Sequence, residues 1–190
     1  TAKVKSAWVT HDGHTPQQMQ EGKVAEFIGF QEIGCHIVFD IKMDFTRKAR
    51  FVAGGHTTTV PSSLTYSSVV SHDSVRLAFL IAALNDIDIM SCDLENAYLN
   101  APCREKIWFE GGLKCGKDCG KVCVVVRSLY GLKPAGAVFW SSLAQILRDL
   151  GYESSRADPD IWMQKAVRDD GHPYYEMLFV YVDDILALSH

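Results

Sequence analysis

Several short stretches of the chain alternate apolar with polar side chains, which is the pattern of a β-strand with one buried face. Residues 37–43 and 47–53 show it on either side of a short connection, so we expect them to pair as a hairpin. Further strands are predicted at residues 87–94, 107–110, 122–126, 161–163 and 174–182, the last two around a turn at residues 169–172.

Two other stretches have apolar side chains that favour helices. Ser71 is an N-cap residue before an almost wholly apolar run at residues 75–84, which predicts a buried helix. Residues 137–150 carry apolar side chains at helical spacing, and Gly151 ends that helix. Strands and helices in this order predict an α+β fold, an antiparallel sheet with helices packed on one face.

The composition is that of a globular protein. The 190 residues are 47% hydrophobic, enough for one large core or two smaller lobes. No apolar run reaches the roughly 18 to 20 residues of a membrane span, and the first residues lack a signal pattern, so we expect a soluble, intracellular chain without membrane contact. Because it begins at Thr1 and stops at His190 inside a predicted strand, we expect a piece of a longer polypeptide.

The net charge of −4 hides an uneven distribution. Residues 42–50 hold four basic side chains and one acidic, and residues 104–133 hold seven basic and three acidic. From residue 151 onward, three basic side chains stand against eight acidic ones. A basic lobe that meets phosphates and an acidic lobe that collects metal ions would explain this pattern, and so would ordinary solvated surfaces.

Six cysteines occur without secretory features, which favours reduced thiols. Three of them recur at every fourth position: Cys115, Cys119 and Cys123. Zinc is one interpretation, but zinc loops favour two-residue gaps with a matched second pair, and only Cys103 is close by, so we favour incidental cysteines in a glycine-rich loop. His11, His14 and His36 are expected to be surface or hydrogen-bonded residues rather than metal ligands.

The chemistry is concentrated in carboxylates that interrupt apolar strands. Asp183 and Asp184 break the apolar run at residues 178–188, which requires either a cation or a simple turn between two strands. Asp93 stands at the end of the predicted strand 87–94, and neighbouring strands of one sheet would bring the three carboxylates together. Three such charges favour a pair of divalent cations, as in nucleotidyl transfer.

Four motifs in order then give the chain a specific resemblance. They are residues 93–100 with 106–108, residues 129–140, residues 157–160 and the Tyr-x-Asp-Asp stretch at 181–184. From about Arg47 to the end, the chain resembles the reverse transcriptase of copia-type LTR retrotransposons. Ala135 and Gly136 depart from the Ser-Pro that members of this family often carry, which puts template contacts there in doubt.

The resemblance implies a catalytic site with two Mg²⁺ ions, or Mn²⁺, on Asp93, Asp183 and Asp184. Asp93 and Asp183 would hold the metal and Asp184 would support the site electrostatically. It also implies a set of substrate-binding residues: Lys48, Arg50, Leu94, Tyr98, Tyr130, Gly131 and Lys133. Either Lys48 or Arg50 would hold the triphosphate.

Some of these residues have simpler interpretations. Tyr98 would block a ribose 2′-hydroxyl, or it is an ordinary core aromatic. Lys133 would line the nucleotide, or it is a solvated turn residue. Trp108 and Trp140 are expected in the core rather than as base-stacking platforms.

The resemblance divides the chain into fingers at residues 1–70 and 101–138, and palm at residues 71–100 and 139–190, cut off after the catalytic hairpin. Thumb, RNase H and integrase domains are expected outside it. The implied partners are an RNA or DNA template with primer, and dNTPs, in cytoplasmic virus-like particles. A catalytically dead, nucleic-acid-binding remnant and a different two-metal nucleotidyl transferase or cyclase are the alternatives, although residues 129–133 and the Tyr98 offset disfavour the second.

Overall fold

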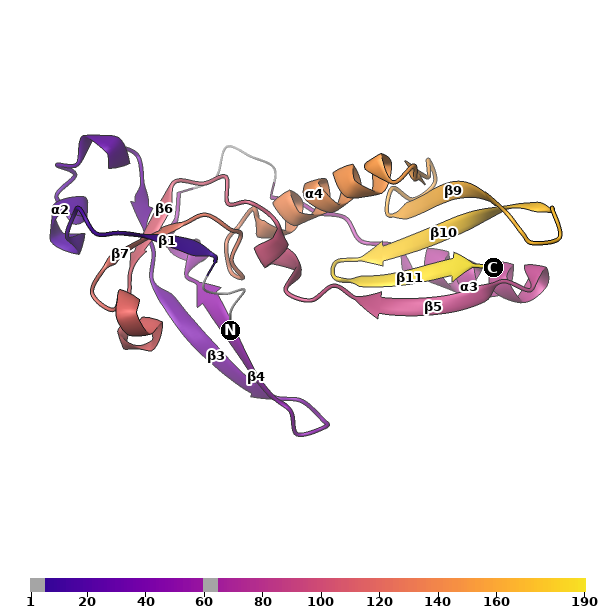
Figure 1. Ribbon diagram of the computed structural model, residues 1–190, viewed down its shortest axis with the longest axis horizontal. Coiled ribbons are helices and arrows are strands. Elements are labelled where there is room, and N and C mark those ends of the chain that lie inside the picture. The colour runs from indigo at the N-terminus through magenta and orange to yellow at the C-terminus, as the bar shows by residue number, and fades with distance from the viewer. Residues whose placement is uncertain (1–5, 60–64) are drawn as a thin grey trace. The chain divides into compact units, whose positions relative to one another are not determined.

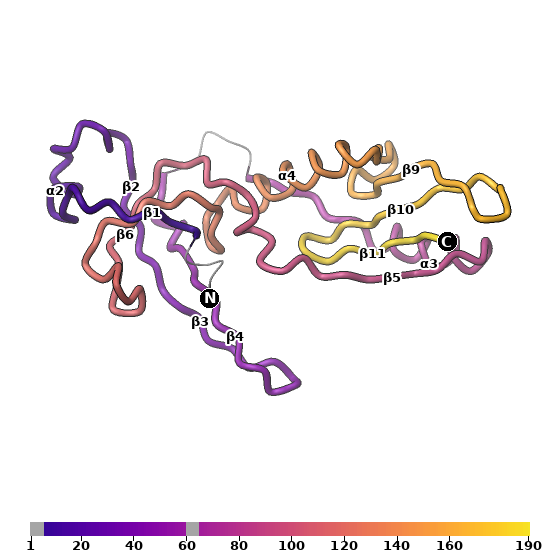
Figure 2. Tube along the Cα trace, in the orientation of Figure 1, coloured from indigo at the N-terminus to yellow at the C-terminus, as the bar shows by residue number. Residues whose placement is uncertain are grey.

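The computed structural model describes residues 6–59 and 65–190 and divides the chain into two compact units (Figure 1). The first unit comprises Thr1–Thr65 and Tyr98–Phe139, and the second comprises Tyr66–Ala97 and Trp140–His190. The chain therefore enters each unit twice, as its path in Figure 2 shows. Residues 1–5 and 60–64, which the predicted segment 1–70 includes, lie outside the described residues.

A four-stranded sheet organises the first unit. Its order is β1 (Trp8–His11), β7 (Val122–Val125), β6 (Ile107–Glu110) and β2 (Gln31–Glu32), antiparallel except for the β2–β6 pair. Short helical elements connect the strands: α2 (Pro16–Gln20) and the 3₁₀ turns η1 (Ala25–Phe27), η2 (Gly55–Thr57), η3 (Ala97–Asn100) and η4 (Leu113–Asp118). The predicted strands at 107–110 and 122–126 are confirmed to within one residue.

The predicted hairpin at residues 37–53 is also confirmed. β3 (Cys35–Ile41) pairs with β4 (Arg47–Ala53) in a regular antiparallel register that runs from Cys35 opposite Ala53 to Ile41 opposite Arg47. Only the base of the hairpin joins the core of the unit, because Ala53 is buried while Phe39 and Ile41 are largely exposed. The hairpin therefore projects its far end into solvent, as Figure 1 shows.

Aromatic side chains form much of the first unit's core. Trp8 meets Phe109 edge-on with ring centroids 5.4 Å apart, and Phe51 of β4 lies 5.3 Å from Trp8. Trp108, on the other face of β6, is 2% exposed and packs with Met19 and Val122, which confirms it as a core residue. The two faces of β6 therefore face separate apolar clusters.

The second unit contains the predicted antiparallel sheet. Its order is β5 (Asp88–Asp93), β11 (Asp184–Ser189), β10 (Pro173–Tyr181), β9 (Ile161–Val167) and β8 (Glu153–Ser154). Every neighbouring pair is antiparallel. The tight turn between β9 and β10 lies where residues 169–172 predicted it, with Gly171 at a φ of +87°.

The helix α3 (His72–Asn85) starts as predicted, since the hydroxyl of Ser71 accepts a hydrogen bond from the Ser74 amide at 3.1 Å. Its predicted burial is wrong. One stripe with Ala78 and Ala82 packs on the sheet at Phe179, whereas the other faces are open. Four apolar side chains are more than half exposed: Leu77, Phe79, Leu80 and Leu84. A continuous apolar run surrounds a helix at 100° per residue, and one sheet covers only one side of it.

The helix α4 (Ala135–Asp149) ends before Gly151, whose φ of +94° stops it as predicted. The Arg148 guanidinium lies 5.5 Å from the ring centroid of Trp162. Trp162 pairs with Leu178 of β10, so it projects from the face opposite to that of Phe179. Because α3 packs at Phe179, the helices contact opposite faces of the sheet, not the single face that the sequence predicted. Among the described residues, no helix combines the length and hydrophobicity needed to traverse a bilayer.

Candidate active site

The paired aspartates lie at the closed end of the β10–β11 hairpin, Asp183 in the turn and Asp184 at the start of β11. Tyr181 pairs with Asp184 across the hairpin, so Val182 and Asp183 form the turn. Val182 has a φ of +56°. A β-branched residue in this left-handed region is strained by about 1–3 kcal/mol, and such strain is found most often at functional sites. The sequence did not indicate Val182 as a special residue, because a valine gives no sign that its φ is positive.

The pairing of β5 with β11 brings the third aspartate to this turn. Asp93 lies directly opposite Asp184, and the Leu94 amide donates a hydrogen bond of 2.7 Å to the Asp183 carbonyl. Residues directly opposite each other share a face, with Cβ atoms about 4.5–5.5 Å apart. The structure therefore places the three predicted aspartates at one corner of the sheet, at the end of β5, in the hairpin turn and at the start of β11.

The electrostatics of this corner are unbalanced. Asp93 and Asp184 are exposed and Asp183 is half-buried. No ion pair within residues 6–59 and 65–190 involves any of the three. Carboxylates grouped in this way suit a divalent cation, which prefers hard oxygen ligands.

The donor set fits Mg²⁺ in kind. Mg²⁺ prefers hard oxygen ligands and is bound through one or two carboxylates, with water and substrate phosphates filling its octahedron. The carboxylates do not converge on a single point, since the only three described metal-binding side chains with ligand atoms within 4.8 Å of one another are His11, His14 and Glu26. Mg²⁺ sites shared with a phosphate do not need three protein ligands on one ion, so the corner suits such ions.

The basic residues of β4 lie in the first unit. Lys48 and Arg50 are two positions apart, so both project from one face of the hairpin. The Arg50 guanidinium stands 3.7 Å from the Asp40 carboxylate, and Lys48 lies opposite Asp40 across the hairpin. Two cations on one face suit an anionic ligand such as a triphosphate.

The backbone around Tyr130 packs directly against the backbone of β4. The Ala53 amide donates to the Tyr130 carbonyl at 2.7 Å, and Gly131 has a φ of +93°. A Cβ on Gly131 would lie 2.1 Å from the Ala53 carbonyl oxygen, and one on Gly55 would lie 2.2 Å from the Gly131 carbonyl oxygen. Both glycines are therefore required for the close approach of two backbones.

Tyr98 and Lys133 are each held in place within the first unit. The Tyr98 ring lies 4.7 Å from Tyr130 and 5.9 Å from Phe139, and it remains half-buried. The Lys133 ammonium donates to the Thr58 carbonyl at 2.6 Å. Lys133 is thus a tethered side chain rather than a solvated one, and the rigid Tyr98 ring is consistent with both its core and its sugar-blocking interpretation.

Two acidic residues, the half-buried Asp158 and the buried Asp160, join elements of the second unit. The Asp158 carboxylate accepts hydrogen bonds from the Ser74 hydroxyl at 2.6 Å and the Ser71 amide at 3.1 Å. Burial alone would raise the pKa of Asp158, but these bonds and one from the Asp160 amide outweigh it and lower that pKa. Asp160 is fully buried, and the Trp140 indole N–H donates to its carboxylate. Trp140, predicted in the core, is half-buried.

Three cysteines of the first unit, Cys35, Cys115 and Cys123, lie close together. Burial, reinforced by the neighbouring Cys115 thiol, raises the pKa of Cys35 and of Cys123 to about 12. In the described part of the chain, no cluster of three metal-binding atoms includes a cysteine.

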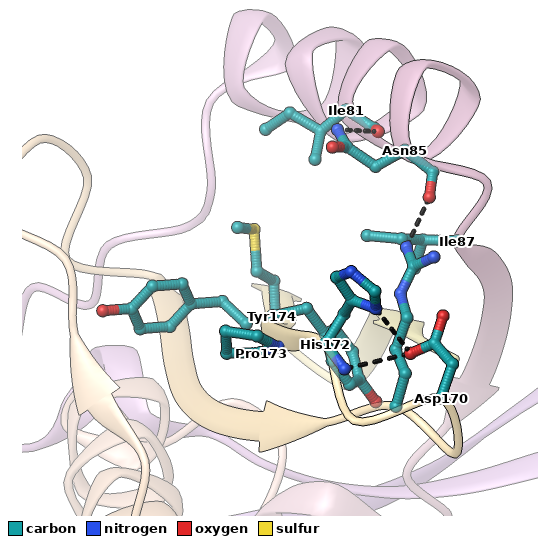
Figure 3. A pocket seen from close by; sticks show the side chains of 10 residues that line it. Ile81, Asn85, Ile87, Asp170, His172, Pro173 and Tyr174 are labelled. Carbon is teal, nitrogen blue, oxygen red and sulfur yellow. Dashed lines mark hydrogen bonds and ion pairs between the residues drawn. The ribbon is translucent and has the colours of Figure 1, made fainter.

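A hollow of about 580 Å³ lies away from the aspartates, between the end of α3 and the β9–β10 turn (Figure 3). His172 and Asp170 face each other at 3.2 Å, and Arg168 donates to the Asn85 carbonyl. Pro173 borders the hollow and begins β10, whereas Tyr181 ends it beside the aspartates. The two places are roughly 26 Å apart along the strand, so the hollow is not part of the carboxylate corner.

Comparison with known proteins adds a family to this geometry. Residues 24–190 match the family described as "Reverse transcriptase (RNA-dependent DNA polymerase)". The chain is 26% identical over 170 residues to the retrovirus-related Pol polyprotein from transposon TNT 1-94 of Nicotiana tabacum, covering 85% of this chain and 12% of that protein. It is 28% identical over 161 residues to the transposon Ty1-BL Gag-Pol polyprotein of Saccharomyces cerevisiae, covering 83% of this chain and 8% of that protein.

Proposed function

The chain belongs to the reverse transcriptase (RNA-dependent DNA polymerase) family, with relatives among copia-type retrotransposon polyproteins, and we propose that it transfers nucleotides from dNTPs to a primer 3′-hydroxyl on a template. In this proposal the second unit is the palm and the first unit is the fingers. The unit boundaries at residues 65, 97 and 139 compare with 70, 100 and 138 in the sequence-based division.

One observation carries the proposal: Asp93 lies opposite Asp184 and beside Asp183 at the open end of two neighbouring strands. We propose Asp93 and Asp183 as the principal ligands of two Mg²⁺ ions, for which Mn²⁺ could substitute, and Asp184 as the third negative charge. When bound, two such ions would lower the pKa of the primer hydroxyl and neutralise charge on the triphosphate. The aspartates would present their oxygens at one corner of the sheet, because the pairing of β5 with β11 fixes the two strands relative to each other.

The remaining substrate contacts are proposed for the first unit and for the residue after Asp93. Lys48 and Arg50 would bind the triphosphate from one face of β4. Tyr130, Gly131 and Lys133 would line the nucleotide, supported by the close packing of their backbone on β4. Leu94, which is half-buried and whose amide donates to the Asp183 carbonyl, is proposed as a further substrate-binding residue. Tyr98 is proposed to exclude a ribose 2′-hydroxyl.

We further propose that the chain works as part of a longer Pol polyprotein, because it spans only 12% and 8% of the two relatives above. Thumb, RNase H and integrase domains, a primed RNA or DNA template and cytoplasmic virus-like particles belong to this proposal. Nucleic-acid contact in the fingers would explain the basic side chains of residues 42–50.

The test is primer extension on an RNA template by the polyprotein that contains this chain. Asp93→Asn and Asp183→Asn each remove one metal-binding charge at nearly constant volume, so each is expected to reduce extension by about 10³-fold, in line with the loss of a major electrostatic group from an active site. Asp88→Asn is the matched control, because Asp88 is an exposed aspartate at the opposite end of the same strand. It should retain full activity.

Two results would contradict the proposal. Full activity of Asp183→Asn would remove the carboxylate corner from the mechanism. An inactive wild-type polyprotein that still binds primed template would instead support the catalytically dead, nucleic-acid-binding remnant.

A further inference from the structure

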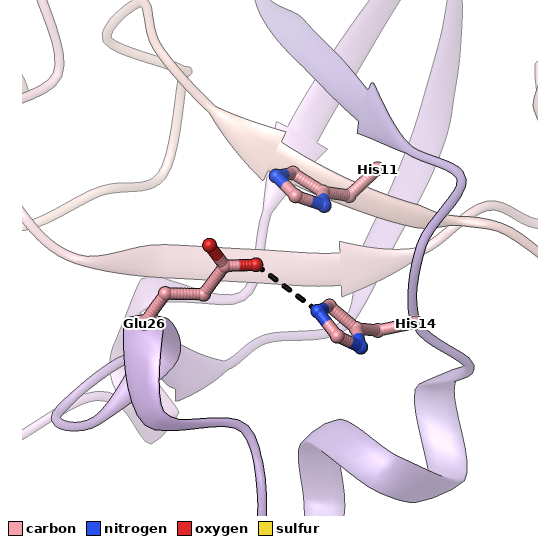
Figure 4. A group of neighbouring side chains, drawn as sticks. All are labelled: His11, His14 and Glu26. Carbon is pink, nitrogen blue, oxygen red and sulfur yellow. Dashed lines mark hydrogen bonds and ion pairs between the residues drawn. The ribbon is translucent and has the colours of Figure 1, made fainter.

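A second group of metal-binding side chains lies in the first unit, near the beginning of the chain. His11 ends β1, His14 follows it by three residues, and Glu26 belongs to η1. One ligand atom from each lies within 4.8 Å of the other two. Figure 4 shows the Glu26 carboxylate directed toward both imidazole rings, with its hydrogen bond to His14 drawn as a dashed line.

The distances suit a tetrahedral ion. Zn²⁺ binds imidazole nitrogen and carboxylate oxygen at about 2.0–2.2 Å, which places neighbouring ligands about 3.3 Å apart. His14 Nε2 and Glu26 Oε1 are already 3.0 Å apart, and the two imidazole rings are stacked with centroids 6.0 Å apart and an angle of 12°. To bind one ion, the ligand atoms, now at most 4.8 Å apart, must come within about 3.3 Å of one another. The stacked rings must also rotate, because each nitrogen lone pair lies in its ring plane.

The backbone beneath these ligands is held by contacts that do not involve a metal. His11 is paired with Val122 in the sheet. Asp12, the next residue, forms a 2.7 Å ion pair with Lys121. Thr15, which follows His14, makes a reciprocal capping box with Gln18 at the start of α2. The backbone beside each histidine is therefore held in place by its neighbour, Asp12 or Thr15. This lowers the entropy cost of ordering the site when an ion binds.

An aromatic wall orients the two rings. Phe27, next to Glu26, meets the His11 ring edge-on at 4.8 Å and the His14 ring edge-on at 6.1 Å. Glu26 itself is more than half exposed, and a solvent-open hollow of about 540 Å³ lined by His14 and Glu26 gives an ion access. A simple His–Glu ion pair needs one histidine, whereas here a second imidazole is stacked on the first within reach of the same carboxylate.

We propose that His11, His14 and Glu26 form a Zn²⁺ site that ties the end of β1 to η1, with a fourth position open to water. Two imidazoles and one carboxylate are a donor set that zinc accepts, and imidazole selects it over Mg²⁺, which prefers oxygen. The site is separate from the aspartate corner in composition and in unit. His11 and His14 also precede residues 24–190, the part that matches the reverse transcriptase family.

The test is calorimetric titration of Zn²⁺ into the untagged 190-residue chain carrying Cys92→Ser, Cys115→Ser and Cys119→Ser, which removes the two exposed thiols and one partly exposed thiol. One equivalent should bind. His11→Ala and Glu26→Gln should each weaken binding by at least about 100-fold, beyond the 10- to 100-fold typical for outer-shell partners. His36→Ala, an exposed histidine on β3, should leave affinity unchanged.

Co²⁺ gives an independent readout of the ligands. It should show intense tetrahedral ligand-field bands without a thiolate charge-transfer band, and His14→Ala should abolish them. Glu26→Gln is nearly isosteric at an exposed position, so circular dichroism should confirm that it stays folded. Three results would overturn the proposal: no Zn²⁺ binding, wild-type affinity in the His11→Ala or Glu26→Gln variant, or a thiolate band in the unsubstituted protein that accounts for all bound metal.

Discussion

Asp158 connects the beginning of α3 to the segment between β8 and β9. Its carboxylate accepts hydrogen bonds from the Ser71 amide and the Ser74 hydroxyl, 87 and 84 positions away in sequence. The same N-cap residue, Ser71, accepts a bond from the Ser74 amide, so one carboxylate completes the cap of a helix that it does not belong to.

We predict that Asp158→Ala lowers the free energy of unfolding by about 1–3 kcal/mol, because hydrogen bonds to a charged group are lost and the hydroxyl of the buried Ser74 loses its acceptor. Urea denaturation would measure it. Asp73→Ala is the control, since Asp73 forms only an exposed ion pair with Arg76 at 3.2 Å and should change stability by less than about 0.5 kcal/mol. Equal effects of the two variants would contradict the role of Asp158.

The same carboxylate predicts a pH dependence. The pKa of Asp158 is lowered from its ordinary value of 3.8, so its contribution to stability is present above that value and is lost as pH falls through the lowered folded pKa. The wild-type chain should therefore lose stability below about pH 4 more steeply than Asp158→Asn, which keeps an acceptor but has no charge to titrate. Parallel curves for the two proteins would show that other carboxylates dominate.

Tyr98 has the rigidity that selection between sugars requires, because two aromatic rings hold it. If it excludes a ribose 2′-hydroxyl, Tyr98→Ala in the polyprotein should raise rNTP relative to dNTP incorporation by about ten- to a hundredfold, at 1.4 kcal/mol per factor of ten. Tyr98→Phe keeps the ring and should keep the selectivity. An unchanged ratio in an active Tyr98→Ala enzyme would leave Tyr98 as a core aromatic only.

At the scale of elements, the first unit depends on the contact between β4 and the segment Leu129–Leu132. That contact is backbone on backbone, and Gly131 and Gly55 lie at its closest points. Side chains would force the two apart, and with them the positions of Tyr130 and Lys133.

We predict that Gly131→Ala destabilises the chain by about 3 kcal/mol or more, because it combines a positive φ with a Cβ in collision with a carbonyl oxygen. Gly116→Ala is a matched control. Gly116 has a φ of +65°, but its Cβ would meet no atom within 4 Å, so only backbone strain of about 1–3 kcal/mol applies, and its loss should be smaller than that of Gly131→Ala. Thermal unfolding of both variants would separate the two effects, and equal losses would refute the close-approach argument.

At the scale of the whole molecule, both units are built from two separate stretches of sequence. Neither sheet can be completed until residues far along the chain are present, since β1 pairs with β7 and β5 pairs with β11. Such long-range pairing is slow to form because loop closure precedes the contacts that reward it.

Charge is also distributed at this scale, with an excess of basic side chains in residues 42–50 and 104–133 and an excess of acidic ones after residue 151. We predict weak primer-template binding by this chain with a steep decline in salt. Replacing both Lys48 and Arg50 by Gln should reduce the slope of log K against log salt by about 2, roughly one per phosphate contact. Lys165→Gln, in the acidic part on β9, should not change it. Tight, salt-insensitive binding would contradict an electrostatic mode.

The sequence predicted the local elements well, because caps, turns and alternation are properties of neighbouring residues. The hairpin at residues 37–53, the Ser71 cap and the stop at Gly151 are of this kind. It failed where a partner decides the outcome: an apolar run does not reveal that only one side of α3 meets a sheet, nor that α4 contacts the other face.

The sequence by itself determined the family, since the four ordered motifs depend on residue identity and spacing alone, and it named the three aspartates as candidates. Only the tertiary structure decided that Asp93 stands opposite Asp184, that Asp158 caps α3 and that His11, His14 and Glu26 face one another. Each of these depends on strand register or on contacts between segments distant in sequence. A shift of one residue in the β5–β11 register would turn Asp93 to the other face of the sheet, and no local pattern in the sequence specifies that register.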